Sequence, residues 1–194
     1  MANSKNISVN IYTDGACAGN QSDRNFGGWG AILEYGKHVK ELCGGEQDTT
    51  NNRMEMSALI SALSALNQDG LRVNVFSDSS YLTNCLRDQW YVKWRRNGWL
   101  TSNKTPVENR DLWERLLSFL PKHDFRFYHV KGHVNLDGKR TDIPAAYGKF
   151  LAKNAGVLPD GDAFSYEDFL HITRMNNRAD ALANAGISEI RPAE

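Results

Sequence analysis

Four acidic residues occupy positions from which their carboxylates could act together. Asp14 and Asp78 each end a run of alternating apolar and polar residues that is typical of a strand. In open sheets with parallel strands, functional sites form beyond the carboxyl ends of the strands. Glu55 lies three and four residues before apolar positions of a predicted helix, so it shares the buried face, and Asp180 lies in the first turn of another predicted helix.

Carboxylates brought together in this way indicate a divalent-metal site. Four converging negative charges repel one another strongly unless a cation neutralises them. Oxygen ligands without a cluster of Cys or His favour Mg²⁺ or Mn²⁺ over Zn²⁺. Two such ions about 4 Å apart clamp the attacking and leaving oxygens of a phosphodiester, so the pattern favours phosphodiester chemistry.

Each acid also has an ordinary structural explanation. An Asp-Gly pair at a strand end, as at Asp14, is typical of a turn. An Asp in the first turn of a helix, as at Asp180, is typical of charge complementation at the helix N-terminus. Spacing alone therefore leaves both interpretations open.

The elements predicted to position these acids are those of a mixed sheet. Three strands with short connections indicate an antiparallel meander, at residues 7–12, 27–33 and 38–43. Helices and strands then alternate, which indicates parallel pairing, with helices at 51–68, 79–86 and 112–120 and strands at 71–78 and 125–130. Further helices are predicted at 145–155 and 166–174, the second capped by Ser165, and a last one begins at an Asn177 cap and ends at Gly186.

Composition excludes several other classes of protein. The 194 residues are 41% hydrophobic, too apolar for a disordered chain, and no apolar run approaches the roughly 20 residues of a membrane span. The N-terminus lacks the apolar segment of a signal peptide, and three widely spaced cysteines favour a reducing compartment, so we expect a cytoplasmic protein with no membrane partner. The 23 basic and 23 acidic residues cancel, which excludes a uniformly basic nucleic-acid binder but allows a local basic patch.

Five short motifs resemble those of the type 1 ribonuclease H family, in the same order along the chain. They are YTDGA at 12–16, TTNNRME at 49–55, SDS at 77–79, VKGH at 130–133 and NRADALA at 177–183. The resemblance implies the α/β ribonuclease H-like fold, a five-stranded mixed sheet with antiparallel first three strands, a parallel continuation and helices on both faces. The strands expected from periodicity agree with it.

The resemblance also implies roles for the acids and for one histidine. Asp14, Glu55, Asp78 and Asp180 match the metal-binding carboxylates of the family, which implies two Mg²⁺ ions per site with substrate bound and Mn²⁺ as a substitute. His133 follows Lys-Gly and matches a loop histidine that assists proton transfer or product release. These five are the expected catalytic residues.

Substrate contacts are implied by the same resemblance. One set matches positions that reach the RNA minor groove, where contacts to 2′-hydroxyls distinguish RNA from DNA, and it consists of Asn20, Asn51 and Asn52. A second set matches a pocket that grips a phosphate of the DNA strand, and it consists of Thr50, Arg53 and Asn109. Asparagines before a helix are also ordinary caps, and this role is compatible with groove binding.

Residues 90–99 interleave aromatic and basic side chains. One interpretation is an amphipathic turn that packs its tryptophans inside. The resemblance favours the basic protrusion of the family, with Trp90 and Trp94 lining the channel for the DNA strand. Lys93, Arg95 and Arg96 would then supply the salt-dependent binding that the zero net charge does not.

The spacing of the last two motifs departs from the family. Asp180 follows His133 by 47 residues, where the family has about ten, a length typical of a short loop. We therefore expect one catalytic domain over 1–194 with a folded insertion at about 134–176. The apolar faces of its helices are expected to pack on each other or on the neighbouring sheet edge and to hold the His133 loop; they are formed by Tyr147, Phe150, Leu151, Phe169, Leu170 and Ile172.

The leading hypothesis is an endonuclease that hydrolyses the RNA strand of RNA–DNA hybrids by a two-metal-ion mechanism and leaves 5′-phosphate and 3′-hydroxyl ends. The alternative is a weak or inactive hybrid-binding module whose site the insertion occludes. The presence of all four carboxylates argues against it, because an inactive site does not require them. A third hypothesis is a relative of a reverse-transcriptase domain, without a polymerase portion. The expected partner is a hybrid duplex, and the expected state is a monomer.

Overall fold

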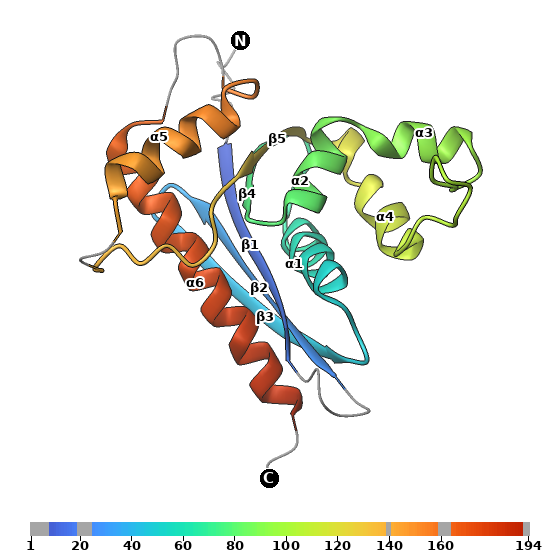
Figure 1. The fold of residues 1–194 in the computed structure, drawn as a ribbon, viewed down its shortest axis with the longest axis horizontal. Coiled ribbons are helices and arrows are strands. Elements are labelled where there is room, and N and C mark those ends of the chain that lie inside the picture. The colour runs from blue at the N-terminus through green and yellow to red at the C-terminus, as the bar shows by residue number, and fades with distance from the viewer. Residues whose placement is uncertain (1–7, 19–24, 139–140, 159–163, 192–194) are drawn as a thin grey trace.

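A single five-stranded sheet, in the order β3-β2-β1-β4-β5, forms the centre of the protein (Figure 1). The computed structural model describes residues 8–18, 25–138, 141–158 and 164–191. β1 (Ser8–Ala18), β2 (Phe26–Tyr35) and β3 (His38–Gln47) pair antiparallel, whereas β4 (Arg72–Ser77) and β5 (Asp124–His129) continue the sheet in parallel from β1. The predicted mixed sheet is confirmed.

Helices cover both faces of this sheet (Figure 1). One face packs against α1 (Asn51–Ser64), α2 (Ser80–Arg87) and α4 (Arg110–Leu117), with α3 (Trp90–Arg96) and the short η1 (Leu120–Lys122) beside them. The other face packs against α5 (Ile143–Asn154) and α6 (Tyr166–Ile190). Among the described helices, none is both long and apolar enough to cross a membrane.

Strand alternation divides the core into two layers. Ile11 and Val75 lie in the layer under α1, whereas their neighbours Tyr12 and Phe76 lie in the layer under α6. Successive side chains of a strand point to opposite faces, so every second residue of β1 and β4 faces α6. This parity decides on which face the aspartates of the predicted site lie.

β1 does not end at Asp14-Gly15 as the turn signal predicts. Its parallel pairing with β4 stops at Thr13 and Ser77, but its antiparallel pairing with β2 continues to Ala18 and Phe26. Pairing with a long neighbouring strand outweighs the local turn preference of Asp-Gly. Asp14 is therefore inside a strand, one residue beyond the last parallel pair.

The two helices predicted at 166–174 and 177–186 are one continuous helix, α6. Ser165 caps it as predicted, but the Asn177 side chain is no cap and instead donates to the Val134 carbonyl at 2.8 Å. Gly186 does not end the helix, because it is the point where α6 touches β3, and a Cβ there would collide with the Gly44 carbonyl oxygen. The C-terminal end of the predicted insertion at about 134–176 therefore falls inside a helix, because α6 continues through residue 176 without a break.

The apolar side chains of α5 and of the first turns of α6 belong to the core. Phe150, Phe169 and Ile172 are buried in the same layer as Tyr12 and Phe76. The Phe150 and Phe169 rings lie 5.5 Å apart. The prediction that these faces pack on each other is confirmed, and they also bury apolar surface of β1 and β4.

Asn154, at the end of α5, joins that helix to the edge strand β5. Its side chain has no exposed surface, accepts from the backbone N–H of His129 and donates to the His129 carbonyl, both at 2.9 Å. The Arg87 guanidinium also donates to it. Because β5 has no further strand beside it, the Asn154 amide satisfies the backbone groups that a neighbouring strand would otherwise pair.

We expect Asn154→Ala to destabilise the protein by roughly 2–4 kcal/mol, because it leaves buried backbone groups of β5 and a guanidinium without a partner. Urea unfolding measures this destabilisation. Asn67→Ala, at an exposed position, is the control and should change stability by less than about 0.5 kcal/mol. Equal stability of the two variants would show that α5 is not held through Asn154.

Candidate metal centre and nucleic-acid interface

The sheet register places Asp14 beside Asp78. Each follows the last parallel pair of β1 and β4, Thr13 with Ser77, by one residue. Both therefore lie at the same level of the sheet and, by alternation, on the face that α6 covers. Glu55 comes from α1 on the other face, and because β4 has ended at Ser77, no strand separates its side chain from the aspartates.

Asp14, Glu55 and Asp78 each offer a carboxylate oxygen, and these oxygens lie within 4.8 Å of one another. Asp14 is 5% exposed and Glu55 only 4%. Asp14 Oδ2, Glu55 Oε2 and Asp78 Oδ1 are buried and have no hydrogen-bond partner. A buried carboxylate oxygen without a donor is costly, so three of them side by side fit a bound divalent cation.

The acids raise one another's pKa. Burial raises the pKa of Asp14 to about 7, and the charges of Asp78 and Asp180 add to the effect. The pKa of Glu55 lies well above its ordinary value, first through burial and then through the charges of the two aspartates. Burial likewise raises the pKa of Asp78. In the absence of a cation, the fold thus favours the protonated form of these groups.

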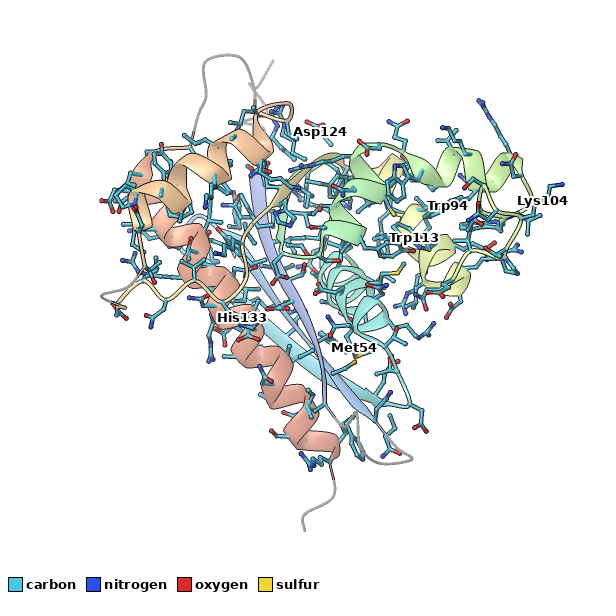
Figure 2. The ribbon with its side chains drawn as sticks, viewed as in Figure 1. Met54, Trp94, Lys104, Trp113, Asp124 and His133 are labelled. Carbon is cyan, nitrogen blue, oxygen red and sulfur yellow. The ribbon has the colours of Figure 1, made fainter. Side chains whose placement is uncertain are left out.

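Asp180 and His133 lie next to these three acids. Asp180 is not one of the residues whose oxygens approach within 4.8 Å, but its charge acts on Asp14 and Asp78. His133 Nδ1 lies 3.5 Å from Asp180 Oδ2, and the His133 side chain is 76% exposed (Figure 2). We call Asp14, Glu55, Asp78 and Asp180 the carboxylate site, with His133 at its rim.

The loop that carries His133 is fixed from two sides. Gly132 lies against Asp78, where a Cβ would collide with the carboxylate oxygen unless the Asp78 side chain shifted. On the other side, Asn177 of α6 binds the Val134 carbonyl. His133 itself has a φ of 53°, a left-handed conformation that a non-glycine residue adopts at a cost.

The three residues predicted to grip a DNA-strand phosphate lie close together. Thr50 is the cap of α1 and accepts from the Arg53 N–H, and Arg53 Nη1 donates to Asn109 Oδ1 at 3.3 Å. The Arg53 guanidinium also forms a bidentate ion pair with the Asp111 carboxylate, with N–O distances of 3.1 and 3.0 Å. The sequence did not identify Asp111, whose carboxylate accepts hydrogen bonds from both terminal nitrogens of Arg53.

The predicted RNA-contacting residues begin α1. Asn51 is exposed and Asn52 half-buried, and both precede Glu55 by about one turn. The cap of the helix is Thr50 rather than either asparagine, so both side-chain amides are left for other contacts. Asn20 lies outside the residues that the structure describes.

The two tryptophans of the predicted basic protrusion have different surroundings. Trp94 packs between Trp99 and Trp113, with ring distances of 6.5 and 5.4 Å, and Figure 2 shows it directed toward Trp113. Trp94 is half-buried: it packs against the edge of the core and leaves part of its side chain exposed. Trp90 is 41% exposed, and Lys93, Arg95 and Arg96 are exposed, so the basic surface is formed by α3.

Sequence reasoning also missed the residues that support the carboxylate site from outside. His129 Nε2 lies 2.8 Å from the hydroxyl of Ser80, two residues after Asp78. Asn154 holds the backbone of the same histidine. An asparagine four residues after Phe150 on a predicted apolar face is the signal that could have identified this contact.

The stability of the metal-free protein should fall as the pH rises from about 4 to about 7. An acid whose pKa is raised by folding binds its proton more tightly in the folded protein, so its stabilising contribution is present at low pH and disappears as the pH rises through the folded pKa. For Asp14 this contribution is at most about 4 kcal/mol. Asp14→Asn should flatten the curve and stabilise the metal-free protein near neutral pH.

Urea unfolding in chelator across this pH range is the measurement. Asp69→Asn, at an exposed position remote from the site, removes the same charge and serves as control. If Asp14→Asn and Asp69→Asn gave parallel curves, the acids would not form a repelling cluster.

Comparison with known proteins assigns this architecture to a family. The RNase H family profile matches residues 6–147. Curated relatives named Ribonuclease H include those of Moorella thermoacetica, 51% identical over 135 residues (69% of this chain and 86% of the relative), and Acetivibrio thermocellus, 53% identical over 125 residues (64% and 82%).

Solved structures with the same fold are more distant in sequence. LC9-RNase H1, described as a type 1 RNase H with the type 2 active-site motif, superposes with a TM-score of 0.58 at 24% identity, covering 96% of this chain and 98% of the other. The foamy viral protease-reverse transcriptase in complex with RNA/DNA hybrid gives a TM-score of 0.63 at 19% identity, covering 95% and 20%. With relatives about half identical and a family match over most of its length, this chain belongs to the RNase H family.

Proposed function

We propose that the protein is an endonuclease that hydrolyses the RNA strand of RNA–DNA hybrids in a reaction that depends on divalent metal ions. The observation that carries the proposal is the cluster of Asp14, Glu55 and Asp78, in which each residue has a buried, unpartnered oxygen that fits a cation. Family membership and the hybrid named with a neighbour of the same fold support the substrate class.

The residues of this chain have distinct roles in the proposal. Asp14, Glu55, Asp78 and Asp180 would hold two Mg²⁺ ions, which would neutralise charge and activate a water for attack on the scissile phosphate. His133, exposed beside Asp180, takes up or releases a proton at its imidazole and aids departure of the product. The products carry 5′-phosphate and 3′-hydroxyl ends.

Substrate contacts extend from the carboxylate site along two elements. Asn51 and Asn52 at the start of α1 face the RNA strand, with Asn20 as a further contact. The DNA strand binds Thr50, Arg53 and Asn109 and the surface of α3, which consists of Trp90, Lys93, Trp94, Arg95 and Arg96. Because Asp111 pairs with Arg53, a phosphate that binds there shares the Arg53 guanidinium with Asp111 or displaces it.

A hybrid-binding module without activity is the second candidate. It requires the segment before α6 to cover the carboxylate site. His133 is 76% exposed and Asp180 26% exposed, and this exposure at the rim favours an open site. Incubation of a labelled RNA–DNA hybrid with Mg²⁺ and then with chelator separates the two, since the binding module retains the hybrid intact under both conditions.

Mg²⁺ as the physiological ion, a cytoplasmic location and a monomeric state belong to the same proposal. All ligands of the carboxylate site are oxygens, which suits Mg²⁺ and allows Mn²⁺. Cys17, Cys43 and Cys85 are free thiols, in keeping with a reducing compartment. The site is built from one chain, so activity does not require a second copy.

Asp14→Asn and Asp78→Asn should each reduce hybrid cleavage by several orders of magnitude while leaving the protein folded, because each removes one charged ligand and relieves repulsion. Cleavage rates with Mg²⁺ and circular dichroism of each variant are the measurements. Asp69→Asn should cleave like the wild type. Near-normal turnover of either site variant would overturn the ligand assignment.

Substitution of Arg95 and Arg96 by alanine should raise KM. It should also lower the slope of log KM against log salt concentration by about one unit for each phosphate that the variant no longer binds. Turnover at saturation should stay unchanged, because such contacts bind ground and transition states alike. The Lys37→Ala/Lys40→Ala pair, on exposed residues of the β2–β3 turn and of β3, removes two charges elsewhere. An equal salt slope for both pairs would place the hybrid away from α3.

A further inference from the structure

A cavity of about 600 Å³ lies between α5, the loop after β5 and α6. Its apolar side includes Val134 and Phe150, and its basic side chains are Lys131, Lys149 and Lys153. We call it the α5 cavity. None of the residues assigned above to substrate binding lines it, and His133 is the single expected catalytic residue that does.

The three lysines of the α5 cavity concentrate positive charge in a protein whose formal net charge is zero. All three are exposed, and none takes part in a salt bridge among the described residues. Lys149 and Lys153 are four residues apart on one helix face, where like charges destabilise a helix. Asp142, the acid in the lining, caps α5 through the Ala145 N–H at 3.0 Å.

The α5 cavity shares a wall with the carboxylate site. Residues 131–133 form that wall: Gly132 lies against Asp78 on one side, and Lys131 and His133 line the cavity on the other. A nucleic-acid strand that leaves the carboxylate site past His133 would therefore come next to the three lysines on the same continuous surface. In Figure 1, α5 and α3 lie at opposite sides of the molecule, so the cavity is separate from the basic surface of α3.

The wall formed by α5 is fixed before any ligand binds. Asn154 ties the end of α5 to both backbone groups of His129, and Phe150 packs on Phe169. Lys149 and Lys153 thus project from a helix that these contacts tie to the sheet and to α6. Preorganisation of this kind lowers the entropic cost of holding a ligand.

We propose that the α5 cavity is a second nucleic-acid subsite, in which Lys131, Lys149 and Lys153 bind backbone phosphates of the strand that extends past His133. Lysine ammonium groups bind phosphate as point charges, and backbone contacts of this kind position a strand without reading its sequence. This inference rests on the proposed function, since the strand belongs to the same hybrid. The subsite makes the segment between β5 and α6 a substrate-binding element.

The test compares two double variants, Lys149→Ala/Lys153→Ala and Lys37→Ala/Lys40→Ala, which remove the same charge. Binding of a labelled RNA–DNA hybrid is measured by fluorescence anisotropy in chelator over a series of salt concentrations. The probes are a blunt hybrid and the same hybrid with single-stranded extensions at each end. The Lys149→Ala/Lys153→Ala variant should bind the extended hybrid more weakly than the wild type does. The slope of log affinity against log salt concentration should fall by up to about two units for this variant and stay unchanged for the control pair.

Three results would overturn the inference. Equal salt slopes for the cavity pair and the wild type on every hybrid would show that no phosphate binds these lysines. Equally weakened binding by the cavity and control pairs would show an effect of overall charge. A change confined to binding of inorganic phosphate, measured by calorimetry, would assign the cavity to a free anion and likewise overturn it.

The proposed function is tested separately by cleavage of the blunt hybrid with Mg²⁺. The cavity pair should retain wild-type turnover at saturating hybrid, because these lysines lie outside the carboxylate site. Failure of the wild type to cleave would overturn the endonuclease while the anisotropy series still decides whether the lysines bind the strand.

Discussion

The repulsion among three closely spaced carboxylates, two of them buried and one half-buried, is the constraint on which the rest of this structure depends. Asp14, Glu55 and Asp78 bring oxygens within 4.8 Å of one another, and burial raises the pKa of each. In the metal-free state this arrangement costs stability, so packing elsewhere must maintain it. Parallel pairing of β1 with β4 fixes the aspartates, and the largely buried α1 fixes the glutamate.

α6 connects the carboxylate site to the segment that precedes it. One continuous helix supplies the Phe169 and Ile172 side chains to the core, the Asn177 amide to the His133 loop and the Asp180 carboxylate to the site. The segment after β5 is therefore integrated with the sheet by packing and by the Asn154 contact. Its removal would uncover the face of the sheet on which the aspartates lie.

Charge is distributed so that a neutral protein presents basic surfaces where a nucleic acid is expected. α3 carries Lys93, Arg95 and Arg96 on one side, and the α5 cavity carries its three lysines on the other. The carboxylate site has the opposite charge, which a bound cation would offset. Local fields of this kind act over about a Debye length, so a zero net charge does not prevent them.

The sequence by itself predicted the sheet and the helical layers, because alternation and helical spacing are local properties of the chain, and its motifs pointed to the acids, of which the structure brings Asp14, Glu55 and Asp78 together. It did not determine where β1 and α6 end, since pairing with β2 and contact with β3 override the turn signals at Asp14-Gly15 and Gly186. Nor did it indicate the pairing of Arg53 with Asp111 or the contact between Asn154 and His129. These contacts join residues distant in the chain, so only the tertiary structure decided them.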